Sequence, residues 1–208
     1  MPTEIVDGVY DITIHTTAGG KRYRTFLFDG ERPTLVDTGL AERTDALFDG
    51  IAEIGLEPER LVVTHGDGDH IGGFDDVVEE YDVETWVPSL TDDSIIDNTP
   101  DHRYGDGDAV ARFTAVHTPG HEPDNHALVD ERVGIAVMGD AVCGSDQRGL
   151  PAGYFHLPPA VHSKDLNQAE ESLERLLEYS FDVGLVFHGT SVTEGADQKL
   201  NRYVNIPE

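Results

Sequence analysis

Four stretches of the chain place a histidine or an aspartate directly after an apolar segment that is typical of a β-strand. They are the segment His65 to His70, and then His121, Asp140 and His188. In open α/β layers, ligands collect at the carboxyl ends of the strands. We therefore expect these turns, which are far apart along the chain, to converge on one pocket. Convergence of turns that follow strands favours an α/β arrangement of strands and helices.

The segment Thr64-His65-Gly66-Asp67-Gly68-Asp69-His70 is the richest of these stretches. It holds two imidazoles and two carboxylates within six residues, on a turn that also contains two glycines. His and Asp supply the nitrogen and oxygen ligands that zinc, iron and manganese accept. The segment predicts half of a metal site; the alternative is a solvated acidic turn, in which Asp and Gly are also common.

The pattern of apolar and polar residues predicts strands that alternate with helices along the whole chain. The expected strands are 9–14, 23–28, 34–37, 61–64, 83–87, 109–117, 127–129, 133–138 and 183–187. The expected helices are 40–54, 74–81, 165–179 and 196–204. The span 144–163 lacks periodicity and is rich in Gly, Pro and aromatic residues, so we expect a loop near the site.

Length and cysteine content narrow the kind of metal site. A chain of 208 residues suits one domain, 1–208, that is large enough to fold alone. The single cysteine, Cys143, excludes an internal disulfide and a cage of thiolates, so a metal ion would be held by His and carboxylate groups. Cys143 itself is expected to be a small buried residue.

The charge of the chain is strongly acidic. The sequence has 41 Asp and Glu against 14 Lys and Arg, a net charge of −27. Such a charge makes the surface carboxylates repel one another at low salt. Near 1 M salt the Debye length falls to about 3 Å and most of this repulsion is screened, so we expect that the protein works in a halophilic cytoplasm. Nucleic acid and anionic membranes are not expected as partners, because both attract basic surfaces.

No leader peptide or run of about 20 apolar residues is evident, which favours a soluble cytoplasmic protein.

The order of the four turns is similar to that of the metallo-β-lactamase superfamily. The resemblance is carried by Thr64 to Gly73, by Thr118-Pro119-Gly120-His121, by Gly139-Asp140 and by His188-Gly189. Leu35-Val36-Asp37-Thr38-Gly39 also resembles the early strand and turn of the superfamily. The resemblance covers nearly the whole chain. It implies an α/β fold, the four-layer αβ/βα sandwich, with two metal ions in a cleft between its halves.

The resemblance also implies a role for each motif residue. The implied ligands are His65 and His121 for the first metal ion, and Asp69, His70 and His188 for the second. Asp140 would bridge the two ions, and Asp37 would hold a ligand and tune its basicity from outside. Two zinc ions are expected, with iron or manganese as the alternatives.

Asp67 departs from the superfamily motif, which usually has a histidine at this place. If Asp67 ligates, three carboxylates and a hydroxide make the metal pair formally neutral, and such a shell suits iron or manganese better than a histidine-rich one. If its carboxylate does not reach, the first metal ion would be held loosely or be absent. We expect Asp67 to ligate. The superfamily includes di-iron redox proteins with a carboxylate, usually Glu, at this position.

The expected function is that of a metal-dependent hydrolase for a small ester, thioester or lactone, by analogy with compact thioesterases and lactonases of the superfamily. A hydroxide that bridges the metal ions would attack the carbonyl of this small-molecule substrate. Asp69 or Asp140 would take the catalytic role of carrying the proton. The sequence leaves the oligomeric state open, a homodimer included.

Two other functions fit the same residues. His65, His121 and Asp140 form a two-histidine, one-carboxylate set of the kind that activates oxygen at non-haem iron, so a persulfide dioxygenase-like or di-iron oxidoreductase is the first alternative. A metal-binding sensor that kept the fold without catalysis is the second. A nuclease is less expected because no long insertion is evident, and no G-x-S-x-G element supports a serine hydrolase.

Histidines outside these motifs are assigned to packing or to the aperiodic loop. His102 is expected in an acidic loop, and His117 and His126 are expected to pack at strand positions. His156 and His162 lie in the aperiodic loop, where they would either line the substrate or belong to a lid.

Overall fold

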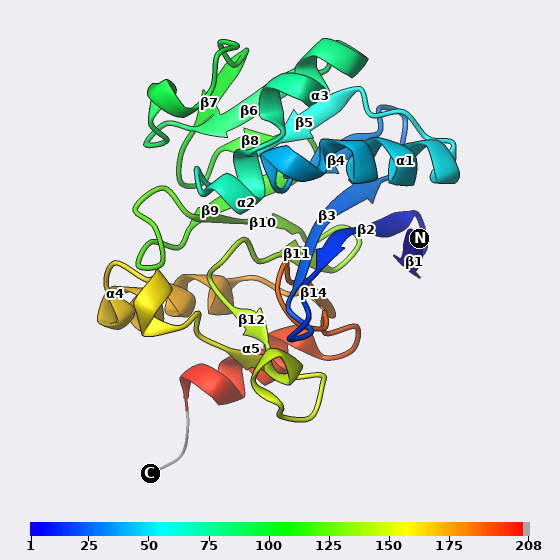
Figure 1. Ribbon diagram of the computed structural model, residues 1–208. Coiled ribbons are helices and arrows are strands. Elements are labelled where there is room, and N and C mark those ends of the chain that lie inside the picture. The colour runs from blue at the N-terminus through cyan, green and yellow to red at the C-terminus, as the bar shows by residue number, and fades with distance from the viewer. Residues whose placement is uncertain (206–208) are drawn as a thin grey trace. The chain divides into compact units, whose positions relative to one another are not determined.

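Residues 1–205 of the chain are described by a computed structural model in which two units each combine a sheet with helices (Figure 1). The units are Met1–Tyr104 and Gly105–Glu208, called unit 1 and unit 2 below. The prediction that residues 1–208 form one domain stays a prediction.

Unit 1 contains a seven-stranded sheet in which the strands follow chain order. Its strands are β1 (Thr3–Val6), β2 (Val9–Thr16), β3 (Arg22–Phe28), β4 (Thr34–Val36), β5 (Arg60–Val62), β6 (Glu84–Pro88) and β7 (His102–Tyr104). Neighbours from β1 to β4 pair antiparallel. Neighbours from β4 to β7 pair in parallel, because longer crossover segments join them.

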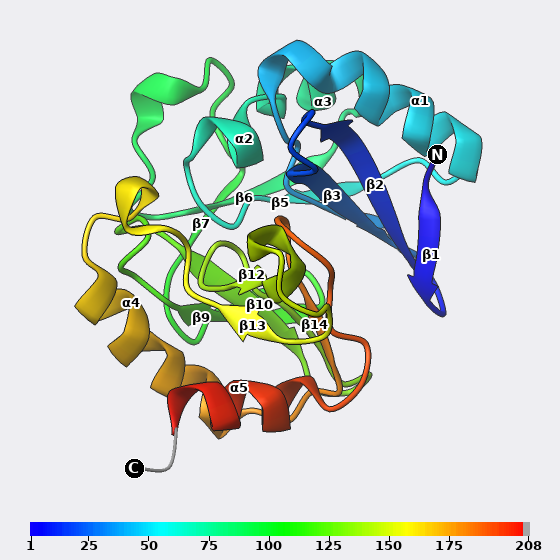
Figure 2. The same cartoon turned by 60° about the horizontal axis from the view of Figure 1, so that its bottom comes forward.

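Helices cover one face of this sheet (Figure 2). The helical segments of unit 1 are η1 (Ala41–Arg43), α1 (Thr44–Ile54), α2 (Gly68–Ile71), α3 (Phe74–Tyr81) and η2 (Asp93–Ile95). Leu47 and Ile51 of α1, and Phe74 and Val77 of α3, recur at helical spacing and are buried in the core of unit 1. Full burial of each such side chain stabilises the fold by roughly 1.5–3 kcal/mol. This apolar face holds the helices against the sheet.

Unit 2 has a five-stranded sheet in the order β14-β11-β10-β9-β8 and a separate ribbon of β12 and β13. The strands are β8 (Ala109–Val110), β9 (Phe113–His117), β10 (His126–Asp130), β11 (Ile135–Val137), β12 (Cys143–Gly144), β13 (Phe155–His156) and β14 (Val183–Leu185). Neighbours from β8 to β11 pair antiparallel, whereas β11 and β14 pair in parallel.

Helices α4 (Leu166–Ser172), η5 (Leu173–Glu178) and α5 (Ala196–Val204) pack on one side of the sheet of unit 2 (Figure 2). Two 3₁₀ turns, η3 (Ser145–Arg148) and η4 (Ala160–His162), lie in the segment between β12 and α4. Leu173 and Leu176 of η5 and Leu200 of α5 are fully buried in the core of this unit. Cys143 is buried as well, as its residue type predicts.

Most predicted elements are present. α3 and α5 occupy the expected segments, and the expected helix 40–54 is η1 followed by α1. α1 ends at Ile54 and is capped by Gly55, which has a left-handed backbone (φ 75°) and whose N–H bonds to the carbonyl of Ile51. The periodicity of apolar residues therefore identified the helices that bury a continuous stripe.

Four expectations about local structure were wrong. The segment 109–117 is two strands, because a tight turn at Ala111 (φ 50°) folds β8 back onto β9. The segment 165–179 changes from α4 to the 3₁₀ helix η5, whose three-residue repeat aligns buried Leu173 and Leu176. His102 lies in the edge strand β7 opposite Trp86, and the expected loop 144–163 contains the β13 strand and two 3₁₀ turns.

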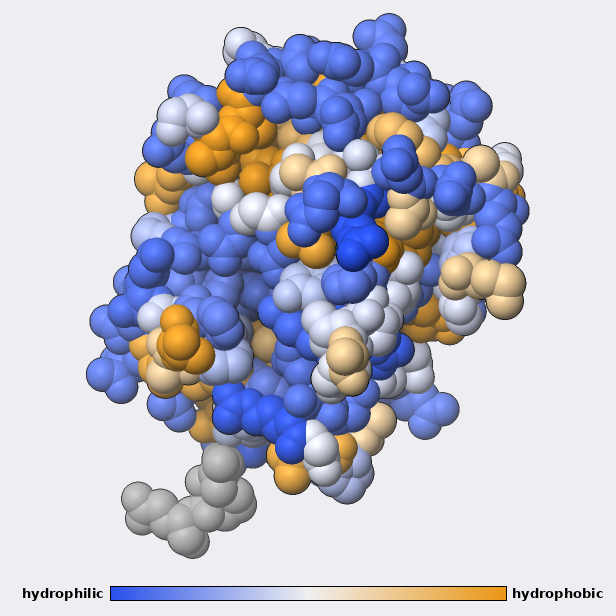
Figure 3. Space-filling model, viewed as in Figure 1, coloured by the Kyte–Doolittle hydropathy of each residue, from blue (hydrophilic) through white to orange (hydrophobic). Residues whose placement is uncertain are grey.

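Acidic side chains cover the solvent side of the unit 1 helices. Asp45 of α1 and Asp76, Glu79 and Glu80 of α3 are exposed. Figure 3 shows a mostly hydrophilic surface over this part of the unit, at the top of the view. Among residues 1–205, the longest and most apolar helices still fall short of what a membrane crossing requires.

Candidate functional site

Strand β5 leads into the first predicted ligand turn, and strand β4 leads into the residue that holds this turn. The two strands pair in parallel, with Leu35 opposite Leu61 and Val36 opposite Val62. Both strands therefore end at the same edge of the sheet. Asp37 follows β4 directly, is fully buried and has a positive φ of 60°.

Asp37 binds the turn after β5 with both carboxylate oxygens. Its Oδ1 accepts a hydrogen bond from the Thr64 N–H at 2.7 Å, and its Oδ2 accepts one from Thr64 Oγ1 at 2.7 Å. Oδ2 also lies 2.7 Å from His70 Nδ1. Burial raises the pKa of Asp37, although its contacts with His70 and Thr64 oppose the rise. The predicted contact between Asp37 and a candidate ligand is confirmed, and it makes Nε2 the atom through which His70 would bind a metal ion.

His65 and His70, which both belong to this turn, form a pair of neighbouring imidazoles. Both side chains are fully buried, and their ring centroids are 4.1 Å apart. Thr64 Oγ1 lies 3.0 Å from His65 Nδ1, so Nε2 is also the metal-binding atom of His65. The candidate ligand atoms of the two residues lie within 4.8 Å of each other. Unit 1 thus contains two imidazoles, each held through Nδ1, whose Nε2 atoms are the candidate metal ligands.

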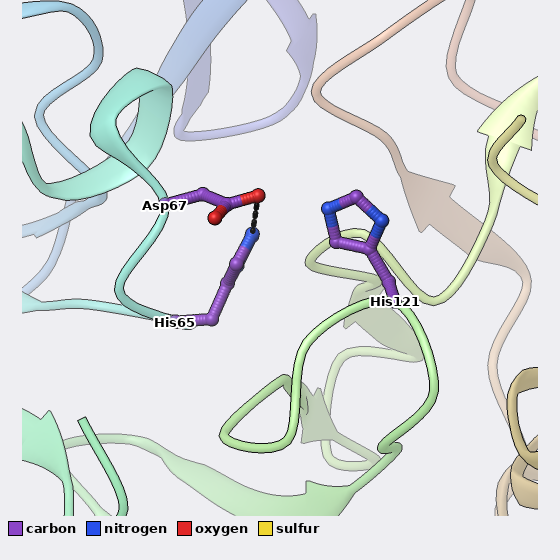
Figure 4. Close-up of side chains that lie close together, drawn as sticks. All are labelled: His65, Asp67 and His121. Atoms are coloured by element: carbon purple, nitrogen blue, oxygen red, sulfur yellow. Dashed lines mark ion pairs between the residues drawn. The ribbon is translucent and has the colours of Figure 1, made fainter. Parts of the chain in front are cut away.

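Two carboxylates border these imidazoles. Asp67 and Asp69 are half-buried, and the candidate ligand atoms of Asp69 and His70 lie within 4.8 Å of each other. Asp67 Oδ2 lies 3.8 Å from His65 Nε2, the contact drawn as a dashed line in Figure 4. The Asp67 carboxylate therefore points toward the metal-binding atom of His65, which is the orientation that ligation needs. Its ligation stays a prediction.

In unit 2 the register of the strands brings three predicted ligands to one end of the sheet. β11 and β14 pair in parallel with Val137 opposite Leu185, and Asp140 and His188 each follow three residues later. β9 runs in the same direction as β11, because each pairs antiparallel with β10. The loop after β9, which carries His121 (Figure 4), therefore leaves the sheet at this end as well.

The three side chains meet at a carboxylate oxygen. His121 Nε2 and His188 Nε2 each lie 3.4 Å from Asp140 Oδ2, and all three residues are 4% exposed. This spacing exceeds the 2.7–3.2 Å that is usual for an N–H···O hydrogen bond. Ligand atoms about 2.0–2.2 Å from a tetrahedral zinc ion lie about 3.3–3.6 Å apart. The donor set and its spacing thus fit ligands of a metal ion.

Two side chains that sequence reasoning missed, the buried Asn125 and the half-buried Asp146, hold these ligands in place. The Asn125 amide bonds both to Thr118 and to the backbone of Asp140, and the Asp146 carboxylate binds Thr190. The only signal in the sequence is a threonine close to each histidine motif, as Thr64 is to His65. A threonine alone does not predict its partner.

The other histidines are engaged in packing and in local bonds. His102 is exposed and bonds to Glu84, while His117 bonds to the Pro123 carbonyl at 2.7 Å. His126 is 2% exposed, and its burial lowers its pKa to about 4. The predicted packing of His117 and His126 at strand positions is confirmed.

His156 and His162 both lie in the segment 144–163. His156 is buried in β13, and its burial lowers its pKa, whereas His162 is exposed in η4. A role of either residue in binding substrate stays a prediction.

Known proteins resemble this chain in sequence and in fold. The family profile described as the metallo-beta-lactamase superfamily matches residues 23–188. Lactamase-like protein adaB from Aspergillus niger is 30% identical over 188 residues, which cover 86% of this chain and 53% of adaB. Hydroxyacylglutathione hydrolase GloC from Haemophilus influenzae is 23% identical over 202 residues, which cover 85% of this chain and 89% of GloC. This chain therefore spans about half the length of adaB but most of GloC.

The likeness extends to solved structures. A metallo-beta-lactamase from Pontibacter korlensis superposes with a TM-score of 0.76 at 23% identity, over 98% of this chain and 96% of that one. This likeness confirms the predicted fold class, the α/β four-layer αβ/βα sandwich.

Proposed function

The chain belongs to the metallo-beta-lactamase superfamily, and from this premise we propose that it is a metal-dependent hydrolase of a small-molecule ester, thioester or lactone. The observation that carries the proposal is the approach of two imidazole nitrogens, from His121 and His188, to Asp140 Oδ2 at 3.4 Å each. Buried charged groups persist where they are paired or coordinate a metal ion. The spacing favours coordination over a direct hydrogen bond.

The proposed centre would hold two metal ions. His65, Asp67 and His121 would hold one ion, Asp69, His70 and His188 would hold the other, and Asp140 would be a ligand of both. Zinc is the proposed metal, because imidazole and carboxylate are common zinc ligands. When bound, such ions polarise a substrate carbonyl and lower the pKa of a coordinated water.

Residues of the chain prepare this chemistry and move the proton. Asp37 fixes the ring of His70 through Nδ1, so that Nε2 faces the centre. A carboxylate oxygen of Asp69 or of Asp140 would accept the proton from the attacking water. Asp69 is half-buried, whereas Asp140 is held between two imidazoles, so Asp69 is freer to pass the proton on to the leaving group.

A thioester is the substrate class that we favour within this proposal. The name of the Haemophilus influenzae relative denotes hydrolysis of hydroxyacylglutathione, which is a thioester. The net charge of −27 disfavours a polyanionic partner such as nucleic acid at ordinary ionic strength.

Metal analysis combined with turnover tests the proposal. The full chain is expressed without added metal, its metal content is measured, and thioester, ester and lactone substrates are assayed. We expect zinc, turnover of at least one substrate class, and a loss of kcat/KM in His121→Ala that exceeds the roughly 10–100-fold cost of losing an outer-shell partner. The matched control is His102→Ala, which removes an exposed histidine bonded to Glu84 and should leave kcat/KM unchanged.

One observation favours a second candidate, a non-haem iron oxidoreductase. The Asp67 carboxylate points toward His65 Nε2 at 3.8 Å, and an added oxygen ligand suits iron better than zinc. Iron in the purified chain together with oxygen consumption on a persulfide would overturn the hydrolase and support this candidate. No turnover of any kind with both ions bound would instead identify a metal-binding sensor.

A further inference from the structure

We propose that Asn125 and Asp146 are positioning residues that fix the geometry of His121, Asp140 and His188 and thereby set the metal affinity of the centre. The inference rests on the proposed function. Neither residue belongs to the proposed ligand set. Asn125 joins two ligand-bearing turns to one another, and Asp146 joins the turn of His188 to the segment that follows Asp140. The relative placement of the ligands therefore depends on both side chains.

Asn125 ties the turn of His121 to the turn of Asp140. Its side chain is fully buried, and its Nδ2 donates to Thr118 Oγ1 at 2.8 Å and to the Thr118 carbonyl at 3.1 Å. Its Oδ1 accepts from the Asp140 N–H at 3.0 Å. The Thr118 N–H donates to the Asn125 carbonyl at 2.9 Å and closes the 118–125 loop. One amide therefore uses both of its donors and its acceptor across two turns.

Asp146 ties the turn of His188 to the segment that follows Asp140. Its carboxylate accepts from the Thr190 N–H at 2.6 Å and from Thr190 Oγ1 at 2.7 Å. The N–H of Gly144 donates to the His188 carbonyl at 2.8 Å. A Cβ at Gly144 would lie 2.4 Å from the Thr190 nitrogen, so the two backbones meet at a distance that only glycine permits.

Loss of the hydrogen bonds of Asn125 or Asp146 should affect metal binding as well as stability, whereas loss of a purely structural hydrogen bond affects stability alone. Loss of a buried partner leaves polar groups unsatisfied, which costs about 1–3 kcal/mol for each group. Here the same loss also releases a ligand turn from its neighbour, and outer partners of metal ligands typically contribute 10–100-fold to metal affinity. The ligands of unit 2 are therefore preorganised by Asn125 and Asp146 before a metal ion binds.

Unit 1 offers a matched control with the same chemistry away from the proposed ligands. The Asp101 carboxylate accepts from the Thr85 N–H and from Thr85 Oγ1, both at 2.9 Å. This pair joins strand β6 to the residue before β7. Asp101→Ala should therefore lower stability and leave metal binding intact.

The experiment compares Asn125→Ala and Asp146→Ala with Asp101→Ala in the full chain. Zinc affinity is measured by competition with a chelator, the visible spectrum of the cobalt-loaded protein is recorded, and urea unfolding of the metal-free protein gives stability. We expect Asn125→Ala and Asp146→Ala to weaken zinc binding about 10–100-fold and to change the cobalt spectrum. Asp101→Ala should lose stability with wild-type affinity and spectrum. Asp146→Asn keeps an acceptor for Thr190 and should restore most of the affinity.

The outcomes separate this inference from the proposed function. Wild-type affinity and cobalt spectra in Asn125→Ala and Asp146→Ala, with only stability reduced, would overturn the positioning role. The expected affinity losses in a chain that hydrolyses no substrate would support the positioning role and remove the hydrolase. Should either alanine variant fail to fold, Thr118→Val and Thr190→Val remove a single hydroxyl contact each and are expected to weaken zinc binding in the same direction.

Discussion

Thr64 and Thr190 are each bound by one buried or half-buried carboxylate through the backbone N–H and the hydroxyl together. Asp37 provides this contact for Thr64 and Asp146 for Thr190. Two hydrogen bonds to one carboxylate fix both the position and the rotation of a threonine, and a ligand turn that begins or ends at that threonine is fixed with it. At the scale of the residue, the geometry of the candidate site is therefore set by neighbours of the ligands as much as by the ligands.

Replacing Asp37 by Asn should change the tautomer of His70 more than it changes stability. The Asn amide keeps an acceptor for the Thr64 N–H but turns a donor toward His70 Nδ1, which then must accept. The proton of His70 moves to Nε2, and that atom can no longer bind a metal ion.

The measurements for Asp37→Asn are zinc affinity, urea unfolding and the nitrogen chemical shifts of His70. We expect an affinity loss of about 10–100-fold, an apo stability within about 1 kcal/mol of wild type, and a proton on Nε2. Unchanged shifts and unchanged affinity would show that Asp37 does not set the tautomer.

His126 should make stability depend on pH. The pKa of His126 is lowered from 6.5 to about 4, mainly by burial and to a smaller extent by the nearby His117, while Asp106 and Asp124 oppose the shift. The unfolded chain binds a proton at pH values where the folded chain keeps His126 neutral. Its contribution is therefore complete above about pH 6.5 and is lost as the pH falls toward 4.

The comparison of wild type with His126→Gln isolates this effect from the many carboxylates. The difference between their free energies of unfolding should shrink by about 2–4 kcal/mol from pH 7 to pH 4, measured by urea unfolding in 1 M KCl. Parallel pH profiles of the two proteins would show that His126 does not titrate as its burial requires.

At the scale of the element, parallel strand pairs explain why the ligand turns meet. β4 pairs with β5, and β11 pairs with β14, so the residues that follow each pair leave the sheet at a common edge. The sequence was sufficient to predict this arrangement, because apolar strands and the His and Asp turns that follow them are contiguous in the chain. The role of Asp37 was predicted from the resemblance of residues 35–39 to the early strand and turn of the superfamily.

Other features depend on contacts between distant segments and were beyond sequence reasoning. Asp146 and Thr190 are 44 residues apart, and neither lies in a pattern that names the other. The turn between β8 and β9 has Ala111 at a φ of 50°, without the Gly or Asn that usually marks such a turn. The change from α4 to η5 follows from the core that Leu173 and Leu176 enter, and that core exists only in the folded chain.

Gly120→Ala should destabilise unit 2 through a clash with α4. A Cβ at Gly120 would lie 2.1 Å from the nitrogen of Ala169, and the residue has a φ of 131°. Overpacking lowers the free energy of unfolding by about 1–3 kcal/mol, and an unfavourable backbone conformation lowers it by about as much again. We therefore expect urea unfolding to show a free energy of unfolding that is at least about 2 kcal/mol lower than that of the wild type.

The control for this prediction is Gly149→Ala, which has a φ of 74° but nothing within 4 Å of the added Cβ. It carries backbone strain without the clash and should cost clearly less than Gly120→Ala. Equal losses in the two variants would show that the loop of His121 does not pack closely on α4.

At the scale of the whole molecule, net charge and fold are the two properties that concern both units. The charge of −27 is spread over exposed carboxylates such as those of α1 and α3. The likeness to a solved metallo-beta-lactamase covers 98% of the chain and therefore both units. The fold supplies the candidate ligands, and the charge predicts that stability depends on the salt concentration of the solvent.

Stability should rise with salt over a range in which surface charges are screened. Raising KCl from 0.1 M to 1 M shortens the Debye length from about 10 Å to about 3 Å, and the repulsion among carboxylates falls with it. We expect a higher Tm and a higher urea midpoint at 1 M KCl. Sucrose at equal osmolality is the control, because it does not screen charge; equal gains in sucrose and KCl would rule out electrostatic screening as the cause.

Anomalous X-ray scattering from crystals grown without added metal tests the central claim most directly. Data collected at the zinc and iron edges report the identity, the number and the ligands of any bound ions. The account predicts two zinc peaks, one bound by His65, Asp67 and His121 and the other by Asp69, His70 and His188, with Asp140 contacting both. Density without an anomalous peak at either edge, with these imidazoles and carboxylates bonded to water or to one another, would contradict it.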